Sequence, residues 1–254
     1  MNSQSSYQHD RNAEILYLEL LISDFGTQPN LRAEEEIKRI YARYNELEKK
    51  RSRILNTVSN NVNRYHQLCL GVHNFLYRGI LKNAGQVRKS SDPNSGQVYF
   101  GGIDPRTMRD KFTGTQPELI IPELNEAFSI LFNQEYDYRE RSIRFYADFV
   151  AIHPFYDANG RIGRYIIDVY LQRQNHYVDW QSINKSHGKL LRKLNYCHSV
   201  RTKYKECLEA INSDSDIKAN KIAYWKSIRE KYIGYLLNFW KKFVFKLDVE
   251  ADEY

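Results

Sequence analysis

The chain has 254 residues, of which 42% are apolar and 27% charged, and its formal charge is +7. This composition can bury a hydrophobic core, so it excludes a disordered chain and a collagen-like or low-complexity one. No apolar stretch approaches the roughly 18 to 20 residues that a bilayer requires, and the polar first residues lack the apolar core of a secretory signal. We expect one globular domain with helical extensions and no membrane partner. Its expected location is the cytoplasm, with delivery to another cell as an effector as the alternative.

The basic surplus is spread over a long chain, and mixtures of Lys and Glu usually solvate helices. Basic and aromatic residues alternate most clearly between residues 192 and 205. On charge alone, nucleic-acid binding is the less favoured of the two interpretations, and we expect no nucleic-acid partner. The odd number of cysteines, without a CxxC spacing, argues against a disulfide framework. They are Cys69, Cys197 and Cys207.

Apolar residues spaced by three and four predict helices along most of the chain. The first runs from about 31 to 55, after a Pro29–Asn30 break that offers an N-cap. Further stripes lie within 68–76, 124–131 and 143–150. A last stripe near the end of the chain is expected to be core rather than a ligand site. Its members are Trp225, Ile228, Tyr232, Leu236, Phe239 and Phe243.

The segment from Gln86 to Gly102 interrupts the helical pattern. Two short extended stretches, Val87–Ser90 and Gln97–Phe100, flank the turn-rich residues 92–96. This arrangement predicts one isolated β-hairpin. We find no internal repeat, and no linker is long enough to separate a second folding domain.

Residues 153–164, HPFYDANGRIGR, lie between two predicted helices. Pro154 disfavours helical backbone at the residue before it, and a new apolar stripe begins at Ile162. A short loop therefore meets a helix N-terminus, whose N–H groups and positive dipole end bind phosphate. Gly160 allows close approach of the backbone, and Asn159 can cap the helix or donate a hydrogen bond.

The side chains around this helix start suit polyphosphate chemistry. Arg161 and Arg164 are three residues apart, and forked guanidinium groups match phosphate oxygens. Asp157 supplies a hard oxygen ligand of the kind that Mg²⁺ prefers. With an unperturbed pKa near 6.5, His153 can accept a proton from a hydroxyl. Singly, a His before a Pro or an Asn-Gly pair is usually structural, but their conjunction at a helix start is much more specific.

This motif resembles the signature of the Fic family, HPFx(D/E)GN(G/K)RxxR, and departs from its commonest form at Ala158. The stretch HNFLYRGILKNAGQVR, residues 73–88, resembles the early family helix and its trailing AGxxR segment. The predicted hairpin stands where the family has its target-docking flap. Arg201, Tyr204 and Leu208 resemble the downstream RxxYxxxL pattern. The resemblance covers roughly residues 60 to 232.

The resemblance implies an all-α, Fic-type helical domain with one small β-hairpin flap, at residues 60–254, preceded by an N-terminal helical extension at 1–59. It implies a protein adenylyltransferase, which transfers AMP from ATP to a Ser, Thr or Tyr hydroxyl of a target protein. ATP is then the substrate, and Mg²⁺ the cofactor.

The resemblance also implies a role for each matching residue. His153 is the general base, and Asp157 holds the Mg²⁺ between the α- and β-phosphates. Arg161 holds the phosphates on the leaving side, and Arg164 holds the γ-phosphate. Phe155 anchors the loop in the core. The nucleotide-binding backbone stretch consists of Asn159, Gly160 and Gly163, and the target-docking edge of the flap consists of Val98, Tyr99 and Phe100.

Two departures from the family pattern affect this interpretation. Ala158 matches the Doc branch, which resembles a Fic fold that works as a protein kinase and has an ANK sequence and no second arginine. Here Arg164 is present and Gly160 replaces the Lys. We therefore favour nucleotidyl over phosphoryl transfer, while UMP and phosphocholine transfer stay open. The extra methyl of Ala158 is a small change unless the backbone there needs a positive φ.

Many family members carry an inhibitory helix with the pattern (S/T)xxxE(G/N). Glu206 is the only glutamate with a Ser or Thr four residues earlier, Thr202, and Cys207 follows it where Gly or Asn is required. We therefore expect no such helix. Three alternatives remain, namely a separate antitoxin-like inhibitor, an effector without restraint, or a motif of another kind.

Overall fold

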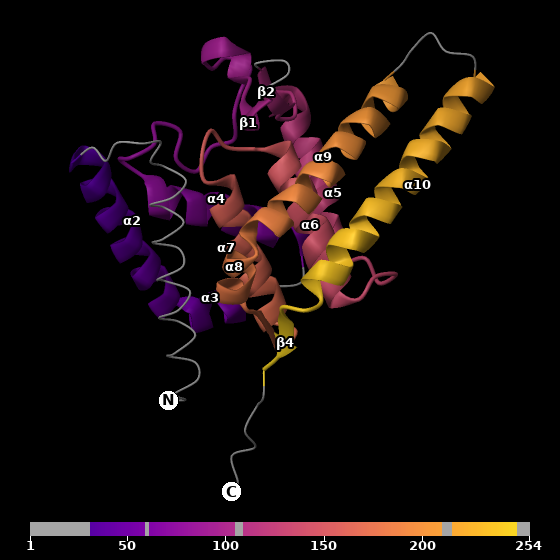
Figure 1. Ribbon diagram of the computed structural model, residues 1–254. Coiled ribbons are helices and arrows are strands. Elements are labelled where there is room, and N and C mark those ends of the chain that lie inside the picture. Colours follow the sequence, from indigo (N-terminus) through magenta and orange to yellow (C-terminus); the bar gives the residue numbers. More distant parts are fainter. Residues whose placement is uncertain (1–30, 59–60, 105–108, 210–214, 248–254) are drawn as a thin grey trace, which may run out of the picture.

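The computed structural model describes residues 31–58, 61–104, 109–209 and 215–247. Within these ranges the chain has the all-α fold that the sequence predicts, with two small antiparallel strand pairs where one hairpin was expected (Figure 1). The helices are α2 (Leu31–Lys49), α3 (Arg51–Thr57), α4 (Val62–Tyr77), α5 (Pro117–Ile130), α6 (Tyr138–Ile152), α7 (Asn159–Gln172), α8 (Trp180–Lys185), α9 (His187–Glu209) and α10 (Ser215–Trp240). The strands are β1 (Tyr99–Asp104), β2 (Arg109–Thr113), β3 (His176–Val178) and β4 (Val244–Lys246).

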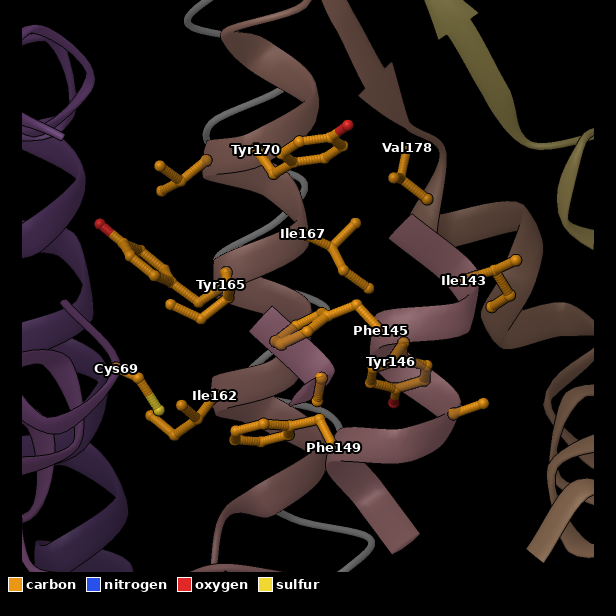
Figure 2. Packing of buried hydrophobic residues seen from close by; sticks show 14 of the residues in the cluster. Cys69, Ile143, Phe145, Tyr146, Phe149, Ile162, Tyr165, Ile167, Tyr170 and Val178 are labelled. Carbon is orange, nitrogen blue, oxygen red and sulfur yellow. The ribbon is translucent and has the colours of Figure 1, made fainter. Parts of the chain in front are cut away.

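Helix α7 lies at the centre of the core and packs against α4, α6 and β3. Figure 2 shows Phe145 and Phe149 of α6 beside Ile162 and Ile167 of α7, all of them fully buried. The two helices approach closely at Gly163, where a Cβ atom would lie only 3.0 Å from the Tyr146 ring. This contact fixes the start of α7 against the end of α6, and the loop between these ends carries the HPFYDANGRIGR motif.

The predicted N-terminal helix is present but is divided. The helix from about 31 to 55 is broken at Lys50, which separates α2 from α3. The predicted apolar stripe is confirmed, since Ile37, Ile40, Tyr44 and Leu47 are buried in the main core. The candidate N-cap at Pro29–Asn30 lies outside the described residues, and the boundary at residue 59 stays a prediction.

The predicted hairpin is present but begins later than expected. Residues 87–89 are irregular, and a 3₁₀ turn at Pro93–Gly96 replaces the expected hairpin turn. The strands that pair are β1 and β2, with Phe100 opposite Phe112 and a bulge between Phe100 and Ile103. The boundaries in the sequence analysis are therefore wrong. The bulge accommodates the Gly101–Gly102 pair, where the sequence predicted that the hairpin ends.

Helices α9 and α10 pack along each other and project from the body of the protein (Figure 1). The predicted α10 core stripe is correct only near its end, since of its members Leu236 is fully buried and Tyr232, Phe239 and Phe243 are partly buried against the core. The residues that are buried are Ile233, Leu236, Leu237 and Trp240, whereas Trp225, Ile228 and Tyr232 are half-buried. In the described part of the chain, no helix has both the length and the apolar character needed to cross a membrane.

The basic segment at 192–205 does not form one continuous basic surface. Arg201 and Lys205 turn inward and form ion pairs with Glu123 of α5. These contacts attach α9 to the body of the protein. The alternation of basic and aromatic residues in this segment therefore has a structural explanation for two of its basic members.

Candidate active site

The loop between α6 and α7 is held by contacts that the motif itself supplies. Helix α6 ends at His153, whose left-handed backbone (φ 54°, ψ 58°) lets its N–H donate to the Phe149 carbonyl at 3.2 Å. Asn159 uses both ends of its side-chain amide on the Phe155 backbone, each at 2.9 Å. The Phe155 ring is fully buried and stacks on His73 at 3.9 Å. Phe155 therefore anchors the loop as predicted, and the Asn159 side chain holds the loop rather than facing outward.

Arg88 is the second support of this loop. Its buried guanidinium donates to the carbonyls of His153 (2.8 Å) and Thr115 (2.7 Å), and also to that of Gly96. Burial lowers the pKa of Arg88 to about 10, so the group is still charged at neutral pH. One side chain thus joins the loop after α6, the segment before β1 and the segment after β2.

The His153 ring has the state required of a base. Its Nδ1 lies 3.3 Å from the Val150 carbonyl, which can only accept, so Nδ1 carries the proton and Nε2 keeps its lone pair. Burial lowers the pKa of His153 to about 4, and the nearby Arg88 charge acts in the same direction. The imidazole is therefore neutral at neutral pH.

The flap lies over this histidine. The Phe100 ring stacks on His153 at 4.3 Å, and the buried His198 of α9 contacts both Phe100 and Phe112 edge-on, at 5.6 and 5.4 Å. Of the three predicted docking residues, Phe100 therefore contacts the His153 ring. Tyr99 is 61% exposed, and the Val98 carbonyl accepts from the Gly114 N–H at 3.0 Å.

The first turn of α7 presents backbone donors and an arginine together. The first intrahelical bond joins the Ile162 N–H to the Ala158 carbonyl, so the N–H groups of Asn159 and Gly160 precede it at the helix end. Arg164 folds back towards this end of the helix. Its Nη1 lies 3.5 Å from the position that a Cβ atom of Gly160 would occupy. The same nitrogen donates to the Tyr146 hydroxyl at 3.3 Å. Gly163 does not face this end but serves the helix packing described above.

Asp157 and Arg161 form an ion pair at 3.1 Å within the same loop and helix turn. The Asp157 side chain is 46% exposed, whereas that of Arg161 is 6% exposed. A single accessible carboxylate fits a Mg²⁺ ion that keeps several waters and is shared with phosphate oxygens. Among the described residues, no group of three His, Cys, Asp or Glu side chains could hold a metal ion without ligands from water or phosphate.

Ala158 occupies the N-cap of α7 with a left-handed backbone (φ 66°, ψ 10°). The methyl group of Ala158 was expected to matter only if the backbone needs a positive φ at this position, and the backbone does have a positive φ here. Ala pays roughly 1–2 kcal/mol for that conformation, whereas Gly pays little.

Ala158→Gly and Ala147→Gly are therefore expected to differ. Both alanines are buried, but Ala147 has a helical backbone inside α6. The expected free energy of unfolding is about 1–2 kcal/mol higher for Ala158→Gly than for Ala147→Gly, as measured by urea denaturation. Equal losses in the two variants would show that the Ala158 conformation is not strained.

The structure therefore brings His153, Asp157, Arg161 and the first turn of α7 to one loop, with Arg164 reaching back to it. Several residues that support this site were not predicted from the motif, namely His73, Arg88, Gly114, Tyr146 and His198. Gly114 illustrates why, since a Cβ there would lie 2.7 Å from Val98 and 2.9 Å from Arg88. A lone glycine gives no sequence signal for such a contact.

Comparison with known proteins relates the segment that carries the site to a known family. The Fic/DOC family model matches residues 64–171, which include the whole motif. A Fic domain-containing signaling protein from Bacteroides thetaiotaomicron VPI-5482 has a similar structure, with a TM-score of 0.50 and 15% identity over 99% of this chain and 94% of that one. A Fic family protein from Desulfovibrio desulfuricans G20 aligns with 94% of this chain at 17% identity and a TM-score of 0.45, and this chain spans 61% of its length. No curated protein matches the chain. The segment that carries the motif, residues 64–171, therefore matches the Fic/DOC family, and the chain has a fold like that of a Fic domain-containing protein.

Proposed function

We propose that this protein is a Fic-type transferase that moves AMP from ATP to a hydroxyl of a target protein. The observation that carries the proposal is the neutral His153, whose Nε2 keeps its lone pair beside a helix N-terminus that also holds two arginines. A base next to an anion site suits the attack of a hydroxyl on a phosphate. The flap that lies over His153 also suits a protein as the acceptor of AMP.

In the proposed reaction, His153 Nε2 takes the proton of the target hydroxyl. The hydroxyl oxygen forms a bond to the α-phosphorus, and the bond from that phosphorus to the oxygen bridging the α- and β-phosphates breaks. Pyrophosphate leaves with the electron pair of that bond. The backbone N–H groups of Asn159 and Gly160, together with Arg161, stabilise the negative charge on the phosphates, and Arg164 aligns the γ-phosphate.

Asp157 would hold Mg²⁺ against the phosphates, and the ion would neutralise charge on their oxygens. Asp157 is already paired with Arg161, so nucleotide binding would replace this pair. The carboxylate would then face the metal and the guanidinium the phosphates. Both groups would keep a partner of opposite charge throughout.

The test is incubation of the protein with a cell lysate and ATP labelled at either the α- or the γ-phosphate. The proposal expects protein bands labelled from α-labelled ATP only, and none with His153→Asn. Label from γ-labelled ATP only would instead show Doc-like phosphoryl transfer. Label from neither, with transfer from UTP or a choline nucleotide, would replace AMP as the transferred group.

The flap provides a test of target docking. Because the Val98 carbonyl bonds to Gly114, Val98 faces β2, and the next residue, Tyr99, directs its N–H and C=O away from β2. Tyr99→Pro removes that outward donor at the first residue of β1, where proline is tolerated. Transfer to the target is expected to fall about tenfold, because an extended peptide loses one backbone bond and its register.

Tyr99→Ala is the matched control, since it removes the exposed ring and keeps the N–H. It should retain most of the transfer activity, and both variants should bind ATP like the wild type. A larger loss in Tyr99→Ala than in Tyr99→Pro would show that the side chain, rather than the backbone, recognises the target.

A further inference from the structure

Helices α9 and α10, which project from the body of the protein in Figure 1, carry three tyrosine rings in mutual contact. The Tyr196 ring of α9 stacks on the Tyr232 ring of α10, with centroids 5.3 Å apart, and Tyr232 meets Tyr235 edge-on at 5.9 Å. Tyr196 is 50% exposed, and Tyr235 is 47% exposed. Single exposed rings are normal on a protein surface, whereas contiguous ones are typical of an interaction site.

Basic side chains from both helices surround these rings. Nζ of Lys193 and Nζ of Lys231 each lie 6.0 Å from the centroid of the Tyr235 ring, within the range of a cation–π contact. Arg192 is exposed and lies four residues before Tyr196, on the same face of α9. We call this group the tyrosine–lysine patch, which consists of Arg192, Lys193, Tyr196, Lys231, Tyr232 and Tyr235.

The tyrosine–lysine patch carries positive charge that no carboxylate balances. Within the described ranges, Arg192, Lys193 and Lys231 have no carboxylate at ion-pair distance. Glu230, the neighbour of Lys231 in the sequence, pairs instead with Arg144 of α6 at 2.5 Å. The charge of the patch therefore favours an anionic partner, and the formal charge of +7 on the whole chain acts in the same direction.

The arrangement of the rings favours an acidic polypeptide over a nucleic acid. Single-stranded nucleic acid is bound by stacking of its bases on open aromatic faces. Here Tyr196 and Tyr232 stack on each other, and the Tyr235 ring has an ammonium group from each helix over it. The patch therefore offers charged N–H donors rather than open ring faces, and such donors match the carboxylates of Asp and Glu side chains.

We propose that the tyrosine–lysine patch is a docking surface for an acidic segment of the target protein. The flap contacts mainly the backbone of an extended peptide, which distinguishes one target from another poorly. A second contact outside the active site raises the affinity for targets that carry both features, because the second binding event becomes intramolecular. The inference rests on the proposed function, since it assumes that the acceptor of AMP is a protein.

The first test measures binding of a short, fluorescently labelled polyglutamate peptide to the full chain, without nucleotide, by fluorescence anisotropy. The variant with both Lys193→Glu and Lys231→Glu is expected to bind it at least about tenfold more weakly, because two attractions become repulsions. Tyr235→Leu should weaken binding about two- to fivefold, since the ring that holds both ammonium groups is lost. These side chains are at least partly exposed, so both variants are expected to fold.

The matched control carries Lys49→Glu and Lys226→Glu, which change the net charge by the same amount. Lys49 lies on α2, and Lys226 is five residues before Lys231, on another face of α10; both are exposed. This variant should keep the wild-type affinity for polyglutamate within about twofold. Equal losses in the two double variants would show that only the net charge attracts the peptide, and would overturn the inference.

The second test measures transfer of α-label from ATP to lysate proteins. The Lys193→Glu, Lys231→Glu variant is expected to label its targets about tenfold more slowly than the control variant, with an unchanged affinity for ATP. Labelling of every target at the wild-type rate would show that the patch does not dock the target. Tighter binding of oligothymidylate than of polyglutamate at the same ionic strength would assign the patch to nucleic acid and overturn the inference.

The outcomes separate this inference from the proposed function. If the wild type labels no protein with any nucleotide, the proposed function is wrong, and the polyglutamate measurement still decides whether the patch binds acidic chains. If the wild type labels proteins but does not bind polyglutamate, the inference is wrong and the proposed function stands.

Discussion

His153→Asn is expected to lower AMP transfer about 100- to 10,000-fold while leaving the affinity for ATP nearly unchanged. In the proposed mechanism the imidazole accepts the proton through Nε2, which keeps its lone pair once Nδ1 donates to the Val150 carbonyl. Asn is the better replacement here, because it tolerates the left-handed backbone of His153 (φ 54°), whereas Ala adds strain. The measurements are incorporation of α-label and calorimetric titration with ATP.

His153→Ala should show the same loss of transfer with an additional loss of stability. Transfer at the wild-type rate by either variant would remove His153 from the mechanism. A parallel loss of ATP affinity would instead show that the histidine holds the loop rather than acting as a base. The Arg88 bond to the His153 carbonyl is kept in both variants, because it involves the backbone only.

The pH dependence follows from the lowered pKa of His153. An unperturbed histidine loses half of its base form near pH 6.5, whereas burial moves this midpoint for His153 to about 4. As pH falls from 8 to 5.5, the fraction of His153 in the base form should therefore stay nearly constant. A rate of transfer that halves near pH 6.5, measured with saturating ATP, would contradict a buried neutral base.

Arg88→Met is expected to have the largest effect on stability, lowering the free energy of unfolding by about 3–5 kcal/mol. Met keeps much of the volume but leaves the carbonyls of His153, Gly96 and Thr115 without their charged donor in a buried site. The loop that carries His153 would lose its fixed position, so transfer should fall at least tenfold even where the protein is folded. Urea denaturation and α-label incorporation measure the two effects.

Arg53→Met is the control for this change, because Arg53 is exposed on α3. It should alter the free energy of unfolding by less than about 0.5 kcal/mol. Arg88→Lys should behave like Arg88→Met, since one ammonium group cannot reach three carbonyls on separate segments. An Arg88→Met protein as stable as the wild type would show that these bonds contribute little.

The sequence by itself determined the helical class and the resemblance to the Fic family, and it named the residues on which the proposed chemistry depends. Apolar spacing is a local property, and it located the buried faces of α2, α5 and α6 because each such face lies on one continuous helix. The motif at residues 153–164 is equally local. Proline, glycine and paired arginines within twelve residues define a loop and a helix start, so His153, Asp157, Arg161 and Arg164 could be named without the fold.

The tertiary structure alone decided what supports those residues. Arg88 and His153 are 65 residues apart, and nothing near Arg88 in the sequence shows that its guanidinium bonds to the carbonyls of Gly96, Thr115, Ile152 and His153. Trp180 likewise meets Arg164 only because α8 turns back against α7. The hairpin was misplaced because the pairing of β1 with β2 and its bulge depend on contacts across the flap, whereas turn propensity favoured residues 92–96. Hydrogen bonds and ring contacts between distant segments form only when packing brings those segments together. The local periodicity of the sequence therefore cannot predict such contacts.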